Sequence, residues 1–248
     1  MNKLVFYYGV MGCSKSANAL MTKFQYEDRG LNVWLIKPSI DNRADKKIDN
    51  ILKDRFERGE IKKIEVKDKN LEAFITIIPS PNDPTDYEGK IYNIKSIEKE
   101  RTSIVESRVG IKSFATNIFP EDNLIDMLNN YLDITKKNVI ICDEAQFMTP
   151  DQIEQLRFIS DNLNVDCFCY GLRTDFMTNL FPGSKRLFEL ADEVHELESV
   201  CDCGKHAIVN ARLDSNGKVI TTGSQVEIGG NEKYKAMCFH CWKQNIEK

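Results

Sequence analysis

The stretch GVMGCSKS, residues 9–16, has the residue types and almost the spacing of a phosphate-binding loop. Such a loop follows the pattern G-x-x-x-x-G-K-[ST]. Lys15 and Ser16 occupy its last two positions, whereas Ser14 replaces its second glycine. Backbone N–H groups at the start of a helix bind phosphates, because they are unpaired donors and the helix dipole favours anions. We therefore predict an ATP site in which Lys15 contacts the β- and γ-phosphates and Ser16 ligates Mg²⁺. The predicted loop contacts are Gly9, Val10, Met11, Gly12, Cys13, Ser14, Lys15 and Ser16.

Two adjacent acids, Asp143 and Glu144, follow the apolar run NVIIC. A buried strand that ends in carboxylates is typical of phosphoryl-transfer sites, where one carboxylate holds Mg²⁺ and another positions or deprotonates the nucleophile. Adjacent residues leave a strand in different directions, so the two acids can take separate roles. The alternative is a solvated acidic turn, but the glycine loop upstream favours a magnesium site.

Two close cysteine pairs frame a loop-rich segment near the carboxyl terminus. They are Cys201, Cys203, Cys238 and Cys241. Such pairs are typical of a structural Zn²⁺ site, although the CxC spacing of the first pair is tighter than usual. His206 or His240 could replace one thiolate, and the alternative to a metal site is four free thiols or disulfides. We predict that zinc fixes both ends of residues 204–237.

The composition restricts the class of protein. The chain has 248 residues, of which 42% are hydrophobic, and a formal net charge of -4. The amino terminus lacks the apolar run of a signal peptide, and no segment approaches the ~20 apolar residues that cross a bilayer. We expect a cytoplasmic protein without a membrane partner, in which the eight cysteines stay reduced. Zinc ribbons can bind nucleic acid, but residues 201–248 carry no basic stripe, so we expect no nucleic-acid partner.

Apolar runs alternate with helical segments along the chain. We predict strands at residues 3–8, 31–38, 114–118, 138–147, 165–170 and 194–197, and helices at residues 16–28, 121–131, 150–162 and 183–192. Continuous apolar strands between helices indicate an α/β fold, with a parallel sheet covered by helices on both faces. The glycine loop lies between the first strand and the first helix, which is the context that a phosphate loop requires.

The predicted domain organisation has three parts. Residues 1–198 form the α/β domain, and residues 199–248 form a small zinc-binding domain. Residues 45–106 differ in composition and form an inserted subdomain or extended hairpin, because they are dense in Lys, Glu and Asp. Within the insertion, residues 46–58 favour a helix, residues 71–79 favour a strand, and residues 79–89 are rich in turn formers.

Several stretches together resemble the thymidine kinase family in its zinc-containing type II form. They are YYGVMGCSKS, KPSIDNR, SRVG, IICDEAQF, YGLRTDF, GSKRLFELAD, CDCG and QVEIGGNEKY with the CxxC pair after it. The resemblance covers residues 3–41 and 107–242. It implies a P-loop, RecA-like parallel sheet flanked by helices, with a C-terminal zinc-binding lasso domain. It also implies transfer of the γ-phosphate of ATP to the 5′-hydroxyl of thymidine or deoxyuridine.

The same resemblance implies roles for single residues around the phosphates. Glu144 matches the family's catalytic base, and Asp143 matches its Mg²⁺-linked acid. Arg43 lies in a D-x-R element beside the phosphates, where it would neutralise charge in the transition state. The residues that match ATP contacts outside the loop are Asp41, Asp143, Glu144, Ala145 and Gln146.

A further set matches contacts of the nucleoside base. These residues are Phe147, Leu172, Phe176, Phe181, Ile228, Gly229, Gly230 and Tyr234. The segment that ends at Tyr234 matches a lasso that closes over thymine through backbone hydrogen bonds, and zinc would hold the two ends of this lasso. Family members are commonly homotetramers, and dTTP inhibits them.

The chain departs from the family's pattern at two places. Ser14 replaces a loop glycine, and 63 residues lie between Arg43 and Ser107, where bacterial members usually have a short loop. If position 14 requires a positive φ, a serine there costs ~1–2 kcal/mol. The insertion could be a lid, an oligomer contact or a neutral elaboration. These departures leave a second hypothesis, a catalytically weak nucleotide-binding regulator with the same fold.

Overall fold

The structure, a computed structural model, describes residues 2–39, 61–65, 72–80, 83–92, 102–223, 225 and 233–246. The chain divides into two compact units. The first consists of Met1–Asp41 and Val105–Lys248, and the second is Asn42–Ile104. No helix in the described part of the chain is both long enough and apolar enough to span a membrane.

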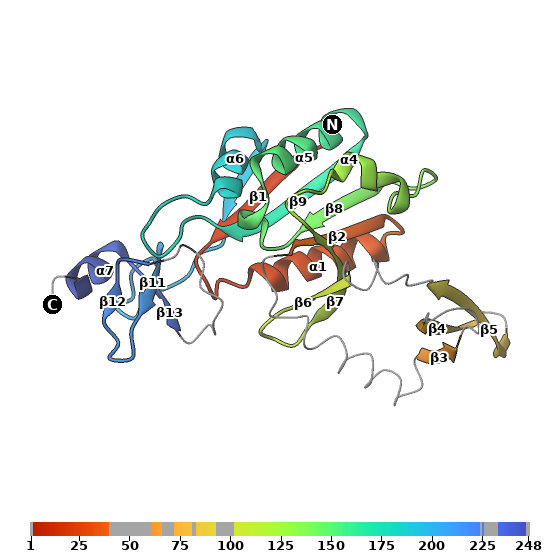
Figure 1. The fold of residues 1–248 in the computed structure, drawn as a ribbon, viewed down its shortest axis with the longest axis horizontal. Coiled ribbons are helices and arrows are strands. Elements are labelled where there is room, and N and C mark those ends of the chain that lie inside the picture. Colours follow the sequence, from red (N-terminus) through yellow and green to blue (C-terminus); the bar gives the residue numbers. More distant parts are fainter. Residues whose placement is uncertain are drawn as a thin grey trace. The chain divides into compact units, whose positions relative to one another are not determined.

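The central sheet has the strand order β10-β1-β9-β8-β2-β7-β6 (Figure 1). Its strands are β1 (Leu4–Gly9), β2 (Asn32–Pro38), β6 (Thr102–Glu106), β7 (Lys112–Ile118), β8 (Asn138–Cys142), β9 (Val165–Leu172) and β10 (Glu193–Glu196). Each neighbouring pair from β10 to β7 is parallel. The prediction of an α/β fold with a mainly parallel sheet is therefore confirmed.

Helices cover both faces of this sheet, with α1 on one side and α4, α5 and α6 on the other (Figure 1). Their bounds are α1 (Lys15–Asp28), α4 (Leu124–Met127), α5 (Pro150–Asn162) and α6 (Pro182–Leu190), with short 3-10 helices η1 (Leu128–Asn130) and η2 (Ala145–Phe147). Alternate residues of a strand enter different cores. In β8, Ile140 and Cys142 pack on the α5 side, whereas Val139 and Ile141 pack on the α1 side. Both faces are buried, which explains the continuous apolar run.

The helix predicted at residues 121–131 is shorter than expected. Asn123 caps its start, because its side chain accepts hydrogen bonds from the backbone N–H groups of Ile125 and Asp126. After one turn the chain tightens into η1, which ends at Asn130. Asparagine competes with the helix for backbone hydrogen bonds, so Asn129 and Asn130 favour this early end.

The second unit contains an antiparallel sheet in the order β3-β4-β5. Its strands are β3 (Ile61–Glu65), β4 (Glu72–Ser80) and β5 (Asp83–Tyr92). The strand predicted at residues 71–79 is confirmed, but the turn prediction for residues 79–89 is wrong over most of its length, because β5 pairs with β4. The helix predicted at residues 46–58 lies outside the described residues. The strand β6 lies within the predicted insertion but belongs to the central sheet.

The carboxyl-terminal region has more regular structure than the loop-rich segment that we predicted. The strands β11 (Val209–Leu213), β12 (Val219–Ile220) and β13 (Tyr234–Met237) form an antiparallel sheet, and α7 (Phe239–Ile246) follows it. A small buried core joins Cys201, Ala211, Met237 and Cys238 to Val10 of the glycine loop. This region therefore packs directly against the predicted phosphate site.

Candidate functional site

The glycine loop connects the end of β1 at Gly9 to the start of α1 at Lys15. Two of its residues have left-handed backbones, Gly12 with φ 84° and Ser14 with φ 63°. The sequence left open whether Ser14 must take this conformation, and it does. Ser14 is exposed, and its side chain makes no capping hydrogen bond to the helix. The serine therefore adopts a backbone conformation that favours glycine, and its carbonyl accepts hydrogen bonds from the backbone N–H and the side-chain Nδ2 of Asn18.

Gly9 and Lys15 define the two ends of the loop. A Cβ atom at Gly9 would stand 2.5 Å from both the Sγ atom of Cys13 and the carbonyl oxygen of Leu197, so only glycine fits there. The Lys15 side chain is buried, and its Nζ atom donates to the carbonyl of Val10 at 2.7 Å. The ammonium thus lies along the loop, at the amino terminus of α1, where an anion is favoured.

Asp143 lies directly after β8 and is 3% exposed. Burial raises the pKa of its carboxyl, and so does the charge of Glu144, whereas a hydrogen bond with Ser16 and the charges of Lys37 and Lys15 lower it, with a net value of about 7. Its Oδ1 atom is buried and has no hydrogen-bond partner in the described part of the chain. A buried orphan carboxylate oxygen next to a serine hydroxyl fits the hard oxygen ligands that Mg²⁺ prefers.

Glu144 has φ 55°, so it also has a left-handed backbone. Its Oε2 atom accepts a hydrogen bond from the Nε2 atom of Gln146 at 2.6 Å. The Oε1 atom of Gln146 in turn accepts from the backbone N–H of Leu172 at 2.9 Å, at the end of β9. Because that N–H can only donate, it fixes which end of the Gln146 amide faces Glu144. The Glu144 carboxylate is therefore linked through Gln146 to the backbone of β9.

Ala145 and Gln146, predicted as ATP contacts, are 0% and 1% exposed. They lie beneath the start of α6, since a Cβ atom at Gly183 would stand 2.7 Å from the carbonyl oxygen of Ala145. A Cβ atom at Gly171 would similarly stand 2.9 Å from Gln146 Oε1. Both residues are therefore enclosed by other parts of the chain, and they pack directly after Glu144.

The predicted base contacts fall into small groups. Phe147 and Phe181 form an edge-to-face pair with ring centroids 5.5 Å apart. Phe176 is buried beneath the Arg212 guanidinium, which also binds the hydroxyl of Tyr234. Leu172 is joined to Gln146 as described above. Five predicted site residues lie outside the described residues: Asp41, Arg43, Ile228, Gly229 and Gly230.

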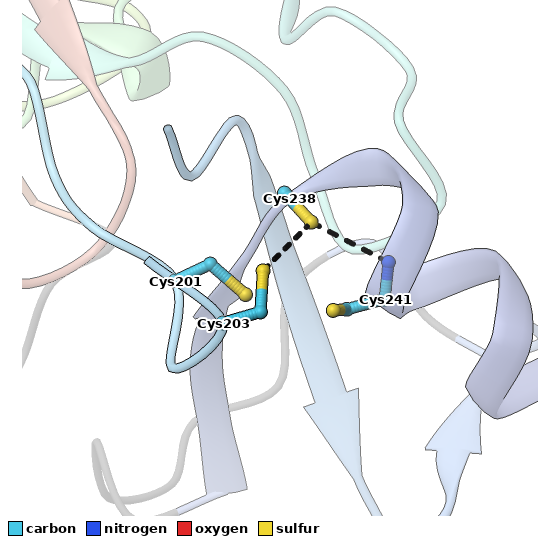
Figure 2. A group of neighbouring side chains, drawn as sticks. All are labelled: Cys201, Cys203, Cys238 and Cys241. Carbon is cyan, nitrogen blue, oxygen red and sulfur yellow. Dashed lines mark hydrogen bonds between the residues drawn. The ribbon is translucent and has the colours of Figure 1, made fainter. Parts of the chain in front are cut away.

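The four predicted zinc ligands meet in one cluster (Figure 2). The Sγ atoms of Cys201, Cys203, Cys238 and Cys241 all lie within 4.8 Å of one another. A tetrahedral zinc ion with Zn–S bonds of about 2.3 Å would set neighbouring sulfurs about 3.8 Å apart. The observed distance between Cys203 Sγ and Cys238 Sγ is 3.6 Å. The cluster therefore fits a structural zinc ion with four thiolate ligands.

Histidine is not needed in this cluster. His206 instead faces Glu196, with 3.1 Å between its Nε2 atom and a carboxylate oxygen.

Burial raises the pKa of Cys201, but hydrogen bonds from the backbones of Cys203 and Cys238 and from neighbouring thiols lower it to about 7. Metal binding requires thiolates, so a lowered thiol pKa in this cluster is consistent with a metal site.

Four residues at the site were missed from the sequence. Lys37 is buried at the end of β2, and its charge lowers the pKa of Asp143. Arg108 lies over Gly12, where its Nη1 atom would be 3.1 Å from an added Cβ. Asn210 and Arg212 reach the site from β11. The stretches KPSIDNR and SRVG contain the first two, but no local pattern distinguishes the residues on β11.

Comparison with known proteins decides the family. The sequence model of the thymidine kinase family matches residues 82–242. The thymidine kinase of Rhodopirellula baltica is 32% identical over 246 residues, which covers 99% of this chain and 90% of the relative. That of Zymomonas mobilis is 34% identical and covers 96% of this chain and 94% of the relative. The chain belongs to the thymidine kinase family.

A third relative agrees with this assignment, and one solved structure is too dissimilar to bear on it. The thymidine kinase of Mannheimia succiniciproducens is 32% identical over 248 residues, covering 100% of this chain and 98% of the relative. Among solved structures, the large terminase of a thermophilic bacteriophage, in complex with ADP, has a TM-score of 0.34 and 10% identity, covering 79% of this chain and 40% of the terminase. That similarity is too low to inform the function of a thymidine kinase family member.

The backbone of Ser14 generates the first prediction. We expect Ser14→Gly to raise the free energy of unfolding by about 1 kcal/mol, because glycine adopts a positive φ without strain. Catalytic activity should be unchanged or higher. Ser14→Ala is the matched control, since it removes a hydroxyl that makes no cap but keeps the strain. Urea denaturation of the three proteins measures the effect, and a less stable Ser14→Gly protein would contradict it.

The cysteine cluster generates the second prediction. Purified protein should contain about one zinc ion per chain, and Cys203→Ala should lose the metal and lower the midpoint of thermal unfolding. The matched control is Cys167→Ala, which removes a buried thiol from the central sheet and should retain the metal. Elemental analysis measures zinc content. Full retention of zinc by Cys203→Ala would show that this cysteine is not a ligand.

Proposed function

We propose that this chain is a thymidine kinase that transfers the γ-phosphate of ATP to the 5′-hydroxyl of thymidine or deoxyuridine. One observation carries the proposal. In a member of this family, Ser16 of the glycine loop lies close enough to Asp143 after β8 to lower the pKa of its carboxyl, and Lys15 and Glu144 stand directly beside them in the chain. These are the residue types that phosphoryl transfer needs at the carboxyl edge of a parallel sheet.

The phosphate end of the proposed reaction rests on the glycine loop. The backbone N–H groups at the start of α1 bind the phosphates, and the Lys15 ammonium exchanges the Val10 carbonyl for a phosphate oxygen. Ser16 and Asp143 would hold Mg²⁺, which shields phosphate charge when it is bound. Arg108 over Gly12 is a further cation for the same phosphates. We assign Asp41 and Arg43 to this end as well, on the family pattern alone.

The nucleophile end rests on Glu144. Its carboxylate accepts the proton of the 5′-hydroxyl as the oxygen attacks the γ-phosphorus, so the acid must be ionised and correctly aimed. Gln146 supports that aim through the 2.6 Å hydrogen bond, and Leu172 holds Gln146. We therefore assign Glu144 as the catalytic base and Gln146 as a residue that positions it. The left-handed backbone of Glu144 is strain retained at the reacting group.

The base end rests on aromatic side chains. We assign Phe147, Phe176, Phe181 and Leu172 to the pocket of the thymine ring, and Tyr234 to the end of a lasso that includes Ile228, Gly229 and Gly230. The cysteine cluster joins the segment before β11 to the end of β13, so a bound zinc would hold both ends of that lasso. A P-loop, RecA-like fold, inhibition by dTTP and a homotetramer complete the proposal, on the resemblance alone.

The second candidate function, a nucleotide-binding regulator without catalysis, rests on Ser14 and the insertion. The strained Ser14 backbone still adopts the left-handed conformation of a loop glycine. Lys15, Ser16, Asp143 and Glu144 are all retained. These observations favour the enzyme, and a steady-state assay with ATP, Mg²⁺ and thymidine separates the two.

The third prediction concerns Glu144, the assigned catalytic base. Glu144→Gln should lower kcat by about 10²–10⁴-fold, because the amide cannot accept the proton of the 5′-hydroxyl. Thymidine affinity, measured by calorimetry, should stay within about threefold, since the shape of the pocket is kept. The control is Glu154→Gln, an exposed acid on α5 that should leave kcat unchanged. Unaltered turnover in Glu144→Gln would remove the assigned role.

The fourth prediction concerns the loop. Lys15→Ala should lower kcat/KM for ATP by about 10²–10³-fold, because one charge on the phosphates is lost. The matched control is Lys23→Ala on the same helix, which removes a lysine that pairs with Glu27 and lies over the Phe24 ring. Near wild-type kinetics for Lys15→Ala would mean that residues 9–16 are not the phosphate site.

A further inference from the structure

The strand β11 has two faces with different contents. Ala211 packs in the small core with Cys201 and Cys238, and Val209 is also buried. Successive side chains of a strand point to opposite faces, so Asn210 and Arg212 share the other face. Both are only 3% exposed. Buried polar side chains require hydrogen-bond partners, and theirs lie in the candidate site.

Asn210 joins the glycine loop to the segment after β9. Its Oδ1 atom accepts from the backbone N–H of Met11 at 2.7 Å. Its Nδ2 atom donates to the carbonyl of Thr174 at 2.9 Å. An N–H can only donate and a carbonyl can only accept, so these partners fix the orientation of the amide. One side chain therefore ties together segments that are 36 and 199 residues away in the chain.

Arg212 contacts two of the aromatic residues that we assign to the thymine pocket. Its guanidinium carbon lies 3.8 Å from the centroid of the Phe176 ring. Its Nε and Nη2 atoms donate to the hydroxyl of Tyr234 at 3.0 and 2.7 Å. Tyr234 is also its cross-strand partner on β13. A cation–π contact is strengthened when the groups are desolvated, so Arg212 holds the two rings at a defined spacing.

We propose that β11 positions both substrates from one face, with Asn210 holding the phosphate loop and Arg212 holding the Phe176–Tyr234 pair. The inference rests on the proposed function, because it takes the loop as the ATP site and the aromatic pair as part of the thymidine site. Both are positioning residues, since neither reaches the reacting atoms. The opposite face of β11 is anchored in the core that holds the cysteine cluster.

The physical reason lies in the backbone of the loop. An amide that donates to a buried side chain cannot rotate, so the Met11 hydrogen bond fixes the direction of the peptide groups beside it. Phosphate-binding N–H groups act only when they are already aimed at the ligand, and small errors of aim are costly. Asn210 supplies that constraint from outside the loop, close to Gly12 and Ser14, whose backbones are left-handed.

The first test separates hydrogen bonding from packing at Asn210. ADP with Mg²⁺ and thymidine are titrated separately by calorimetry into wild type, Asn210→Ala and Asn210→Leu. Both variants should lose about 10- to 100-fold in ADP affinity, and more than they lose in thymidine affinity. Leucine fills the volume of asparagine but makes no hydrogen bond. If Asn210→Leu recovers wild-type ADP affinity, the residue acts by packing and the inference is overturned.

The second test uses Arg212→Met and Arg212→Lys. Arg212→Met should lower thymidine affinity by about 10- to 100-fold and leave ADP affinity within about threefold. Arg212→Lys should recover part of the loss, because it keeps a cation over the Phe176 ring. Equal losses for both ligands in the Asn210 and Arg212 variants would mean general loosening of the structure, and would overturn the division of roles.

The controls address folding and the parent proposal. Asn216→Ala changes an exposed asparagine in the same sheet region and should alter neither affinity. Zinc content and the thermal unfolding midpoint of each variant establish that it is folded. Binding is measured without turnover, so a wild-type protein that binds both ligands but transfers no phosphate rejects the proposed function alone. The pattern of affinities then still decides the role of β11.

Discussion

The buried carboxylate of Asp143 is the constraint around which the site is arranged. Taking a charge out of water is unfavourable, and here burial is the largest cause of the raised pKa. The surrounding groups oppose that cost: Ser16 by a hydrogen bond, Lys15 and Lys37 by charge. They come from α1 and β2, and β8 supplies the acid. The parallel register of β2 and β8 brings their carboxyl ends to one edge of the sheet. The Oδ1 atom of Asp143 has no hydrogen-bond partner among the described residues, so it is available to the divalent cation that we propose.

Local patterns in the sequence predicted most of this edge. The alternation of β8 residues between two cores needs a continuous apolar run, and that run identified the strand before Asp143. The glycine loop and the cysteine pairs could be recognised from residue types at a fixed spacing. The left-handed backbone of Ser14 could not be predicted, because serine rarely adopts it without tertiary support. The strand β5 was missed because its residues include many turn formers, yet they pair with β4.

The contacts that no pattern revealed are long-range ones. Asn210 lies 199 residues from Met11, and Arg212 on β11 lies over the ring of Phe176, which is on a different segment. Hydrogen bonds between single side chains and distant backbone atoms leave no periodicity in a sequence. Gln146 is an intermediate case: its motif predicts an ATP contact, and the structure adds hydrogen bonds to Glu144 and to the backbone of Leu172 that the motif does not reveal. A motif identifies the site, therefore, but tertiary contacts assign the role.

The small carboxyl-terminal region could hardly be stable by itself. Its core consists of a few buried side chains, and domains of this size usually need a metal or another staple. A zinc ion bound by the cysteine cluster would stabilise this region, and Val10 of the glycine loop already packs in the same core. The contact of Val10 acts in both directions. Because Val10 completes that core, the loop cannot change its course without disturbing the region that carries Asn210 and Arg212. The folding of the sheet β12-β11-β13 and the course of the glycine loop therefore depend on each other.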